Sequence, residues 1–125
     1  MFNPYDQYKK TSINTMTKGE LLLLLFDEII KKLNYGKILM ENGDYEEANK
    51  NLQKCRQIFN HLIVTIDKNF ALSGEIVDIY SFLNGEIIKA SAKKSTKHID
   101  DILPIVRNLR DTWEEADKIA RASKN

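Results

Sequence analysis

The stretch TKGELLLLLFDEII, residues 17–30, decides the fold. Thr17 and Glu20 stand three residues apart, which is the spacing of a capping box at the start of a helix. Six large apolar residues follow, from Leu21 to Phe26. A helix that buries one face uses only about three or four apolar residues in two turns. The stretch therefore predicts a helix that begins after Thr17 and carries more apolar surface than one core face needs.

The first helix extends to the Asn42-Gly43 pair, because both residue types tolerate the left-handed conformation that ends helices. Steps of three and four residues place a set of its side chains on one core-facing stripe. That stripe is Leu22, Phe26, Ile29, Leu33, Gly36 and Met40.

A second helix begins at once, because Asp44 is a good N-cap and Glu47 is in the first turn. It stops near Lys68-Asn69. Its expected core stripe is Tyr45, Ala48, Leu52, Cys55, Phe59, Leu62 and Ile66. The turn between the first two helices is so short that they must be antiparallel neighbours.

Two further helices complete the pattern. The third is expected to be capped near Ser73 and to end at Lys93-Lys94, and its stripe is Ile76, Tyr80, Leu83, Ile87 and Ala90. The fourth is expected to start near Ser95 or Thr96. Because the apolar period crosses Pro104, we expect a kink or a late start there. Its stripe is Ile99, Ile102, Val106, Leu109, Trp113, Ala116 and Ala120.

Four helices of about 20–25 residues with short turns predict an all-α fold, an antiparallel up-down four-helix bundle. We expect one domain over residues 1–125, with the bundle at about 17–122. Residues 1–16 are too sparsely apolar for another bundle helix and suit a short N-terminal cap, called the leader below.

The composition narrows the class of protein. Nineteen basic and eighteen acidic residues leave a net charge of +1, which does not favour binding to nucleic acid or to a membrane surface. The single cysteine fits a reducing compartment. The first twelve residues lack the apolar core of a signal peptide, and the run Leu21–Phe26 is far shorter than the roughly 20 residues that span a bilayer. We therefore expect a cytoplasmic protein that is not inserted in a membrane.

The residues that usually carry chemistry are not grouped in this sequence. His61 and His98 fall on different helices, without a nucleophile or carboxylate at a suggestive local spacing. Cys55 lies on a core stripe, where burial raises a thiol pKa. Glu-x-x-His pairs, zinc-ligand spacings and phosphate-binding glycine loops are missing. We expect no enzyme, no catalytic residue, no metal and no cofactor.

The surplus apolar residues are the informative feature. At 100° per residue, Leu24 and Ile38 fall nearly opposite the core face of the first helix, and Leu21 lies on its flank. Either neighbouring helices and the leader cover this surface, or it forms a groove for an apolar helix of a partner. Both hold if the leader covers the groove until a partner arrives. Further surplus positions would let a partner wrap around the bundle: Val77, Ile79, Phe82 and Ile88.

The chain resembles the FliS family of flagellar secretion chaperones along nearly its whole length. The resemblance lies in the order and spacing of several motifs: Asn3-Pro4-Tyr5 with Tyr8, Ile13 and Thr15, Glu20-Leu21, Leu25-Phe26-Asp27, the second helix around ANKNLQKCRQIFNHL, and Arg110 with Trp113. Phe26 stands where the family usually has tyrosine.

The resemblance implies a bundle with a short N-terminal cap and a function without catalysis. Such a chaperone binds the disordered C-terminal segment of flagellin in the cytosol, prevents its early polymerisation and keeps it competent for flagellar type III export. The export gate and an anti-sigma factor are further possible partners. The alternative is an adaptor or regulatory bundle that binds another amphipathic helix, from an anti-sigma factor or a filament cap protein. We expect the partner-binding residues to be Tyr5, Tyr8, Ile13, Thr15, Leu21, Leu24 and Ile38, with Tyr5, Tyr8 and Ile13 over the groove in the free protein.

Overall fold

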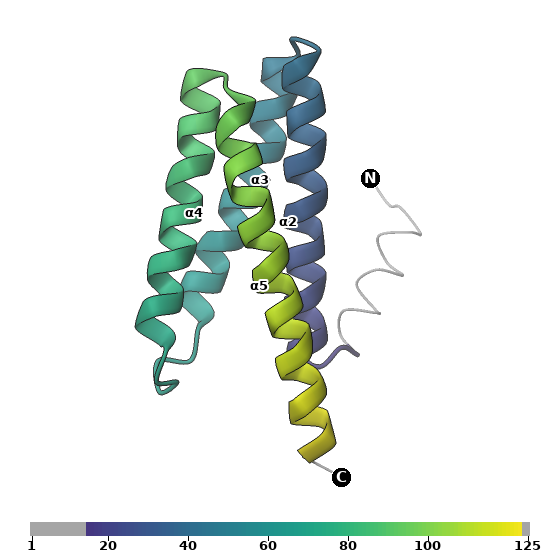
Figure 1. Cartoon of the computed structure of the whole chain (residues 1–125), viewed down its shortest axis with the longest axis vertical. Helices are drawn as coiled ribbons and strands as arrows, with labels where there is room; N and C mark the ends of the chain where they lie inside the picture. Colours follow the sequence, from purple (N-terminus) through teal and green to yellow (C-terminus); the bar gives the residue numbers. More distant parts are fainter. Residues whose placement is uncertain (1–14, 124–125) are drawn as a thin grey trace.

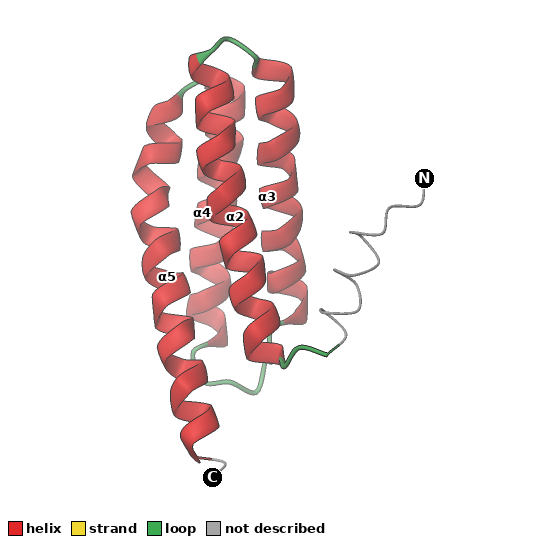
Figure 2. Cartoon of the chain, turned by 90° about the vertical axis from the view of Figure 1, so that its right-hand side faces the viewer, coloured by secondary structure: helices red, strands yellow, loops and turns green. Residues whose placement is uncertain are grey.

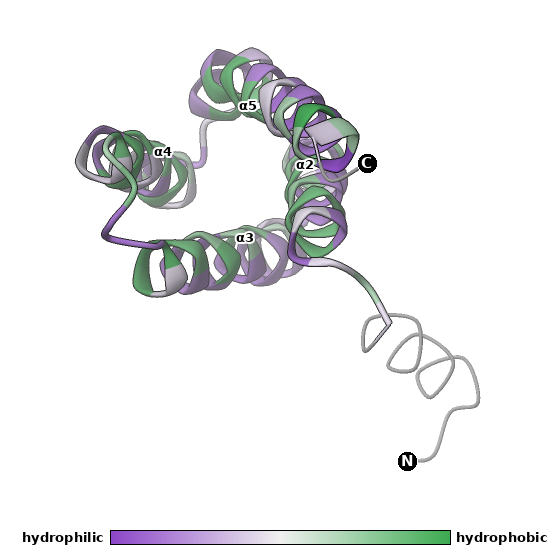
Figure 3. Ribbon diagram, turned by 90° about the horizontal axis from the view of Figure 1, so that it is seen from below, coloured by the Kyte–Doolittle hydropathy of each residue, from purple (hydrophilic) through white to green (hydrophobic). Residues whose placement is uncertain are grey.

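The computed structural model describes residues 15–123, and Figure 1 shows their path. The helices of this part are α2 (Lys18–Glu41), α3 (Tyr45–Thr65), α4 (Ser73–Lys93) and α5 (Thr96–Ser123). Each helix packs against the next, and α5 returns to pack against α2, so the four surround one core (Figures 2 and 3). The predicted all-α, antiparallel four-helix bundle is confirmed.

The first helix and the start of the second follow their local sequence, whereas α3 ends at Thr65, before the stop expected near Lys68-Asn69, because Ile66 is extended. The Thr17 hydroxyl oxygen accepts a hydrogen bond from the backbone N–H of Glu20 at 3.1 Å. The Asp44 carboxylate accepts one from the N–H of Glu47 at 3.3 Å. Between them Gly43 has φ of +80°, a left-handed conformation that glycine adopts without a steric penalty. Short-range capping therefore sets the tight α2–α3 turn.

The start of α4 differs from the prediction. Ser73 is the first residue of the helix, and Leu72 is its N-cap, without a side-chain capping bond among the described residues. The loop before it uses backbone bonds instead, since the N–H of Ser73 donates to the carbonyl of Phe70 at 3.0 Å. At its other end α4 stops at Lys94, whose φ of 52° is left-handed.

The helix α5 runs through Pro104, so the late start that we considered is wrong. Proline inside a helix costs about 3 kcal/mol. Burial of a large aliphatic side chain stabilises by about 1.5–3 kcal/mol, and three such side chains beside Pro104 are buried. These are Ile102, Leu103 and Val106. Packing on both sides of the proline outweighs its local cost, and Pro104 itself is exposed.

The core follows the four predicted stripes for most of their length. At its centre, rings from three helices meet: Phe26 lies 6.4 Å from Phe59 and 6.1 Å from Tyr80, between ring centroids. Cys55 is buried as expected, and burial raises the pKa of its thiol to about 12. Three stripe positions are exposed instead of buried: Tyr45, Ala116 and Ala120. The C-terminal end of α5 extends beyond its neighbours (Figure 1).

Candidate functional site

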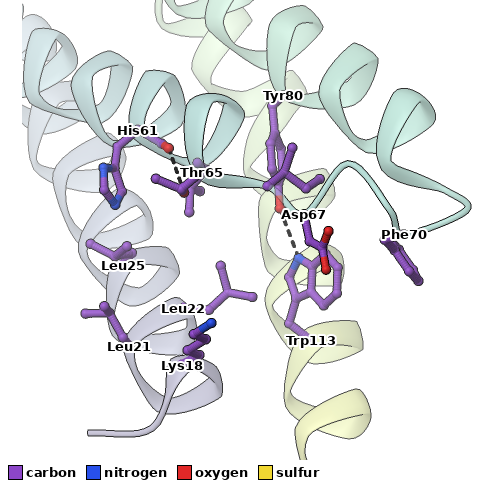
Figure 4. Close-up of a pocket in the computed structure, with 12 residues that line it drawn as sticks. Lys18, Leu21, Leu22, Leu25, His61, Thr65, Asp67, Phe70, Tyr80 and Trp113 are labelled. Atoms are coloured by element: carbon purple, nitrogen blue, oxygen red, sulfur yellow. Dashed lines mark hydrogen bonds between the residues drawn. The ribbon is translucent and has the colours of Figure 1, made fainter. Parts of the chain in front are cut away.

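An apolar cavity of about 550 Å³ opens at the end of the bundle where α2 and α4 begin and α3 ends. Figure 4 shows side chains from all four helices and from the loop after α3 pointing toward it. Most of its lining is aliphatic or aromatic: Leu21, Leu22, Leu25, Leu62, Ile66, Phe70, Tyr80 and Trp113. Polar side chains complete the lining: Lys18, His61, Thr65 and Asp67.

The first two turns of α2 supply one wall. Leu21 and Leu25 stand four residues apart and so lie above one another on the helix, with Leu22 beside them. All three are half-buried. They belong to the apolar run Leu21–Phe26 and line the side of the cavity, and Leu22 and Leu25 also pack against the core.

The loop between α3 and α4 supplies a second wall. Ile66 ends α3 in an extended conformation, and the Asp67 carboxylate accepts a hydrogen bond from the N–H of Asn69 at 2.9 Å. The N–H of Phe70 then donates to the Asp67 carbonyl at 3.1 Å. These turns hold Phe70 at the cavity, where 45% of its surface is exposed.

The floor of the cavity has one polar contact. The Trp113 indole Nε1–H donates to the hydroxyl oxygen of Tyr80 at 3.2 Å, which joins α5 to α4. Tyr80 is only 2% exposed. Burial raises the pKa of the Tyr80 hydroxyl, and the bond from Trp113 opposes that rise. Tyr80 is therefore a neutral hydroxyl at ordinary pH, and the floor carries no charge.

Two motifs that are far apart in the sequence meet beside this end of the bundle. The Arg110 Nε–H donates to the carboxylate of Asp27 at 2.9 Å, and its Nη1 contacts Glu114 at 2.7 Å. The hydrogen bond to Asp27 raises the pKa of Arg110 further, followed by the one to Glu114. Arg110 thus fixes α5 against α2, and Trp113 lies three residues, or nearly one turn, further along α5.

The structure separates the residues that the sequence assigned to one partner site. Leu21 lines the cavity. Leu24 is half-buried on α2 outside the cavity lining, and Ile38 is 53% exposed. Ile38 lies seventeen residues beyond Leu21, or about 25 Å along the helix. Thr15 is exposed, and the remaining expected residues, Tyr5, Tyr8 and Ile13, lie outside the described residues.

Sequence reasoning missed most of the cavity. Leu22, Tyr80 and Trp113 were assigned to core stripes, although all three line the opening. A usable signal was present in the loop: Phe70 and Leu72 are large apolar residues in an otherwise small and polar segment, and they are 45% and 54% exposed.

The lining determines what the cavity can accommodate. Aliphatic and aromatic walls favour apolar side chains, and a few polar groups at a rim favour a defined orientation. Within residues 15–123, no group of three or more His, Cys, Asp or Glu side chains is placed to hold a metal ion. None of the helices in that range is long and apolar enough to cross a membrane.

The family model and the known proteins that match this chain carry the same family name. The model of the family described as flagellar protein FliS matches residues 1–120. The flagellar secretion chaperone FliS of Bacillus subtilis (strain 168) is 31% identical over 123 residues, which cover 98% of this chain and 92% of that protein. The one of Escherichia coli (strain K12) is 20% identical over 110 residues, covering 86% and 81%.

A solved structure described as a flagellar chaperone from bacteria has the same fold. It matches with a TM-score of 0.77 and 17% identity, over 91% of this chain and 94% of that one.

Proposed function

The chain belongs to the FliS family of flagellar secretion chaperones, and we propose that it binds the disordered C-terminal segment of flagellin. In this proposal it acts in the cytoplasm, without catalysis, as one helical-bundle domain. It prevents premature polymerisation of flagellin and keeps it competent for flagellar type III secretion. A client that becomes ordered on binding loses conformational entropy, which lowers its affinity per area and permits release.

The open apolar cavity is the observation that carries this proposal. Its size lies within the range of about 300–1,000 Å³ that is typical of binding pockets, and its walls are mainly leucine, isoleucine and aromatic side chains. An amphipathic helix binds such a surface by inserting side chains spaced three and four residues apart. Flagellin segments that assemble through apolar helical faces would fit this chemistry.

The leader is proposed to cover the cavity in the free protein, through Tyr5, Tyr8 and Ile13. It joins the bundle at Thr17, next to Lys18 and Leu21, which line the cavity. Fourteen residues precede Thr15, and at about 3.3–3.6 Å each they could reach across any part of the opening. A leader that competes with the client would lower the apparent affinity, because only the uncovered fraction binds.

The other expected contact residues are proposed to extend the binding surface along α2. Leu24 is half-buried, and Ile38 and Tyr35 are each 53% exposed on the same helix. Thr15, at the junction with the leader, would lie at the rim. Since these residues are not part of the cavity lining, a client that contacts both surfaces must wrap around the bundle.

The export gate and an anti-sigma factor are further candidate partners of the same surface. An adaptor function would use the cavity for an amphipathic helix from an anti-sigma factor or a filament cap protein. Competition separates the alternatives: on the flagellin proposal, the C-terminal flagellin segment displaces either of those helices from the cavity.

Filament growth tests the proposal. Flagellin monomers of the same organism are seeded with filament fragments, and light scattering is followed with and without the chain. At equal molar amounts the chain should suppress growth, and the cavity variant Leu25→Asp should suppress it less. Unchanged growth in the presence of the folded chain would contradict the proposal.

A further inference from the structure

The first turn of α2 and the last turns of α5 approach each other closely beside the cavity. A Cβ atom on Gly19 would overlap Oδ1 of the Asp117 carboxylate and would lie 3.3 Å from the Asp117 Cβ. The Asp117 side chain is only 16% exposed. Because glycine has no side chain, α5 can pack here directly against the backbone of α2.

Arg121 holds the Asp117 carboxylate in this position. Its Nε lies 3.1 Å from Oδ2 of Asp117, and its Nη2 lies 3.2 Å from Oε1 of Glu20. The same Glu20 oxygen accepts a hydrogen bond from the Thr17 hydroxyl at 3.2 Å, which ties Glu20 to the cap of α2. The dipole of α2 also favours a negative charge beside its first turn. We call this group of four the α2–α5 latch: Gly19, Glu20, Asp117 and Arg121.

The latch lies one helical turn from two walls of the cavity. Gly19 and Leu22 are three residues apart on α2, and Trp113 and Asp117 are four apart on α5, so each pair shares a helix face. Leu22 and Trp113 both line the cavity, and Figure 4 shows them on facing helices. The distance at which Asp117 meets Gly19 therefore sets how far the Leu22 wall stands from the Trp113 wall.

A second contact between α2 and α5 lies on the other side of these walls. It is the bond from Arg110 to Asp27, at 2.9 Å. Asp27 is eight residues beyond Gly19, or about 12 Å along α2. Leu22 lies between the two contacts on α2, and Trp113 lies between them on α5. The wall is thus held at both ends, and loss of the latch would allow the last turns of α5 to shift away from α2.

We propose that the α2–α5 latch positions Trp113 against Leu22 and so sets the width of the cavity. The four latch residues are not among those that line the cavity, so they act as positioning residues. This rests on the proposed function, because the width determines how closely the apolar side chains of flagellin contact both walls. A gap of about 0.5–1 Å already loses a quarter to a half of the dispersion attraction between facing atoms. A small shift of α5 should therefore weaken binding measurably.

A removable cross-link tests the latch directly. The variant carries Gly19→Cys and Asp117→Cys, at positions whose Cβ atoms would lie 3.3 Å apart, close to the roughly 3.5–4.5 Å of a disulfide. Cys55 is fully buried and so does not compete for the bond. The oxidised variant keeps the two helices together, whereas the reduced variant lacks the carboxylate that Arg121 holds. In titration calorimetry with a synthetic peptide of the C-terminal flagellin segment, the oxidised variant should match the wild type and the reduced one should bind about tenfold more weakly.

Two glycine variants form a matched pair for the same titration. Gly19→Ala forces α5 away from α2, whereas a Cβ atom on Gly85 would meet no atom within 4 Å. Gly19→Ala should bind the peptide about tenfold more weakly, and Gly85→Ala should bind it like the wild type. Circular dichroism checks that each variant is folded. Should Gly19→Ala fail to fold, the oxidised and reduced forms of the cysteine variant carry the comparison.

A dye reads the width of the cavity without flagellin. The dye 1-anilinonaphthalene-8-sulfonate binds exposed apolar surface, and energy transfer from Trp113, the single tryptophan, identifies dye bound in the cavity. Gly19→Ala and the reduced cysteine variant should bind this dye about threefold more weakly than the wild type. A variant that is merely destabilised would instead bind more dye, because partly unfolded chains expose apolar surface.

The outcomes separate the two proposals. If dye binding depends on the latch but the wild type does not bind the peptide, the proposed function is wrong and the latch inference stands. If Gly19→Ala and the reduced cysteine variant bind both probes as tightly as the wild type, the latch inference is overturned. Weak binding by the oxidised variant would also overturn it, because α5 would then have to move away from α2 for binding. A wild-type chain that binds neither probe would contradict both proposals.

Discussion

The indole N–H of Trp113 lies 3.2 Å from the hydroxyl oxygen of Tyr80 and donates a hydrogen bond to it. The bond joins α5 to α4 at the cavity, which both side chains line, and Tyr80 is buried. Trp113 is the single tryptophan of the chain. It is therefore both a structural contact and a natural fluorescent reporter of the cavity.

Removing one partner of this hydrogen bond should lower the free energy of unfolding more than removing both partners. Trp113→Phe leaves the buried Tyr80 hydroxyl without its donor, and a buried polar group that loses its partner costs about 1–3 kcal/mol. Adding Tyr80→Phe removes the stranded hydroxyl and should recover part of that loss. Urea unfolding of the wild type, the two single variants and the double variant measures the coupling. Additive losses would show that the two side chains do not interact.

Replacing Gly85 or Gly36 by alanine should change the free energy of unfolding by different amounts. A Cβ on Gly85 would meet no atom within 4 Å, whereas one on Gly36 would lie 3.3 Å from the Leu52 side chain. Gly85→Ala should raise the free energy of unfolding by roughly 0.5–1 kcal/mol, because alanine loses less backbone entropy in a helix. Gly36→Ala should gain less, or destabilise, because Leu52 must shift in a packed core. Thermal unfolding compares the two, and an equal gain would contradict the close α2–α3 contact.

The Glu86–His98 contact should make stability depend on pH. A hydrogen bond from His98 at 2.7 Å, and then one from Lys89, lower the pKa of the Glu86 carboxyl. A lowered folded-state pKa stabilises the protein above the ordinary glutamate pKa of about 4.3, and this stability is lost as pH falls through the folded-state value. Glu86→Gln should therefore destabilise at pH 7 and have a smaller effect in acid.

Urea midpoints of the wild type and Glu86→Gln at successive pH values from 7 to 3 measure this difference. Glu115→Gln, at an exposed position of α5, is the control and should change little at any pH. A Glu86→Gln effect that stays constant into acid would mean that the carboxylate charge is not what stabilises the α4–α5 contact.

The sequence predicts a structural feature best when the interacting residues lie close together in the chain. The capping bonds at Thr17 and Asp44 involve residues three apart, and both were correctly predicted. The start of α4 was not, because backbone bonds in the preceding loop replace a side-chain cap at Ser73. The stripes located the core, since burial follows the helical period.

The cavity depends on how the helix ends are placed in space. Leu21, Phe70 and Trp113 come from three segments far apart in the chain, and no local pattern places them together. Periodicity showed that α2 has surplus leucines, but not that Leu21 shares an opening with Phe70 and Trp113. The hydrogen bond between the side chains of Asn60 and Asn84 also depends on the register between two helices, which sequence periodicity does not fix.

Removal of the leader tests its proposed role as a cover. A chain that lacks residues 1–13 should bind the flagellin segment with a changed affinity, and more tightly if the leader only competes. With the cavity uncovered, the free protein should also aggregate at lower concentration, because exposed apolar surface promotes association. Calorimetry and light scattering measure the two effects. If neither quantity changes, the leader is not a cover.

Titration calorimetry of the full chain with the C-terminal segment of flagellin from the same organism tests the central claim most directly. We predict a one-to-one complex with a dissociation constant in the micromolar range or tighter. Leu25→Asp, in the cavity wall, should weaken it at least about tenfold by placing a charge against apolar side chains. Val64→Asp, at a position that is 78% exposed and outside the cavity, should not weaken it. No binding by the folded wild-type chain at roughly tens of micromolar would contradict the account.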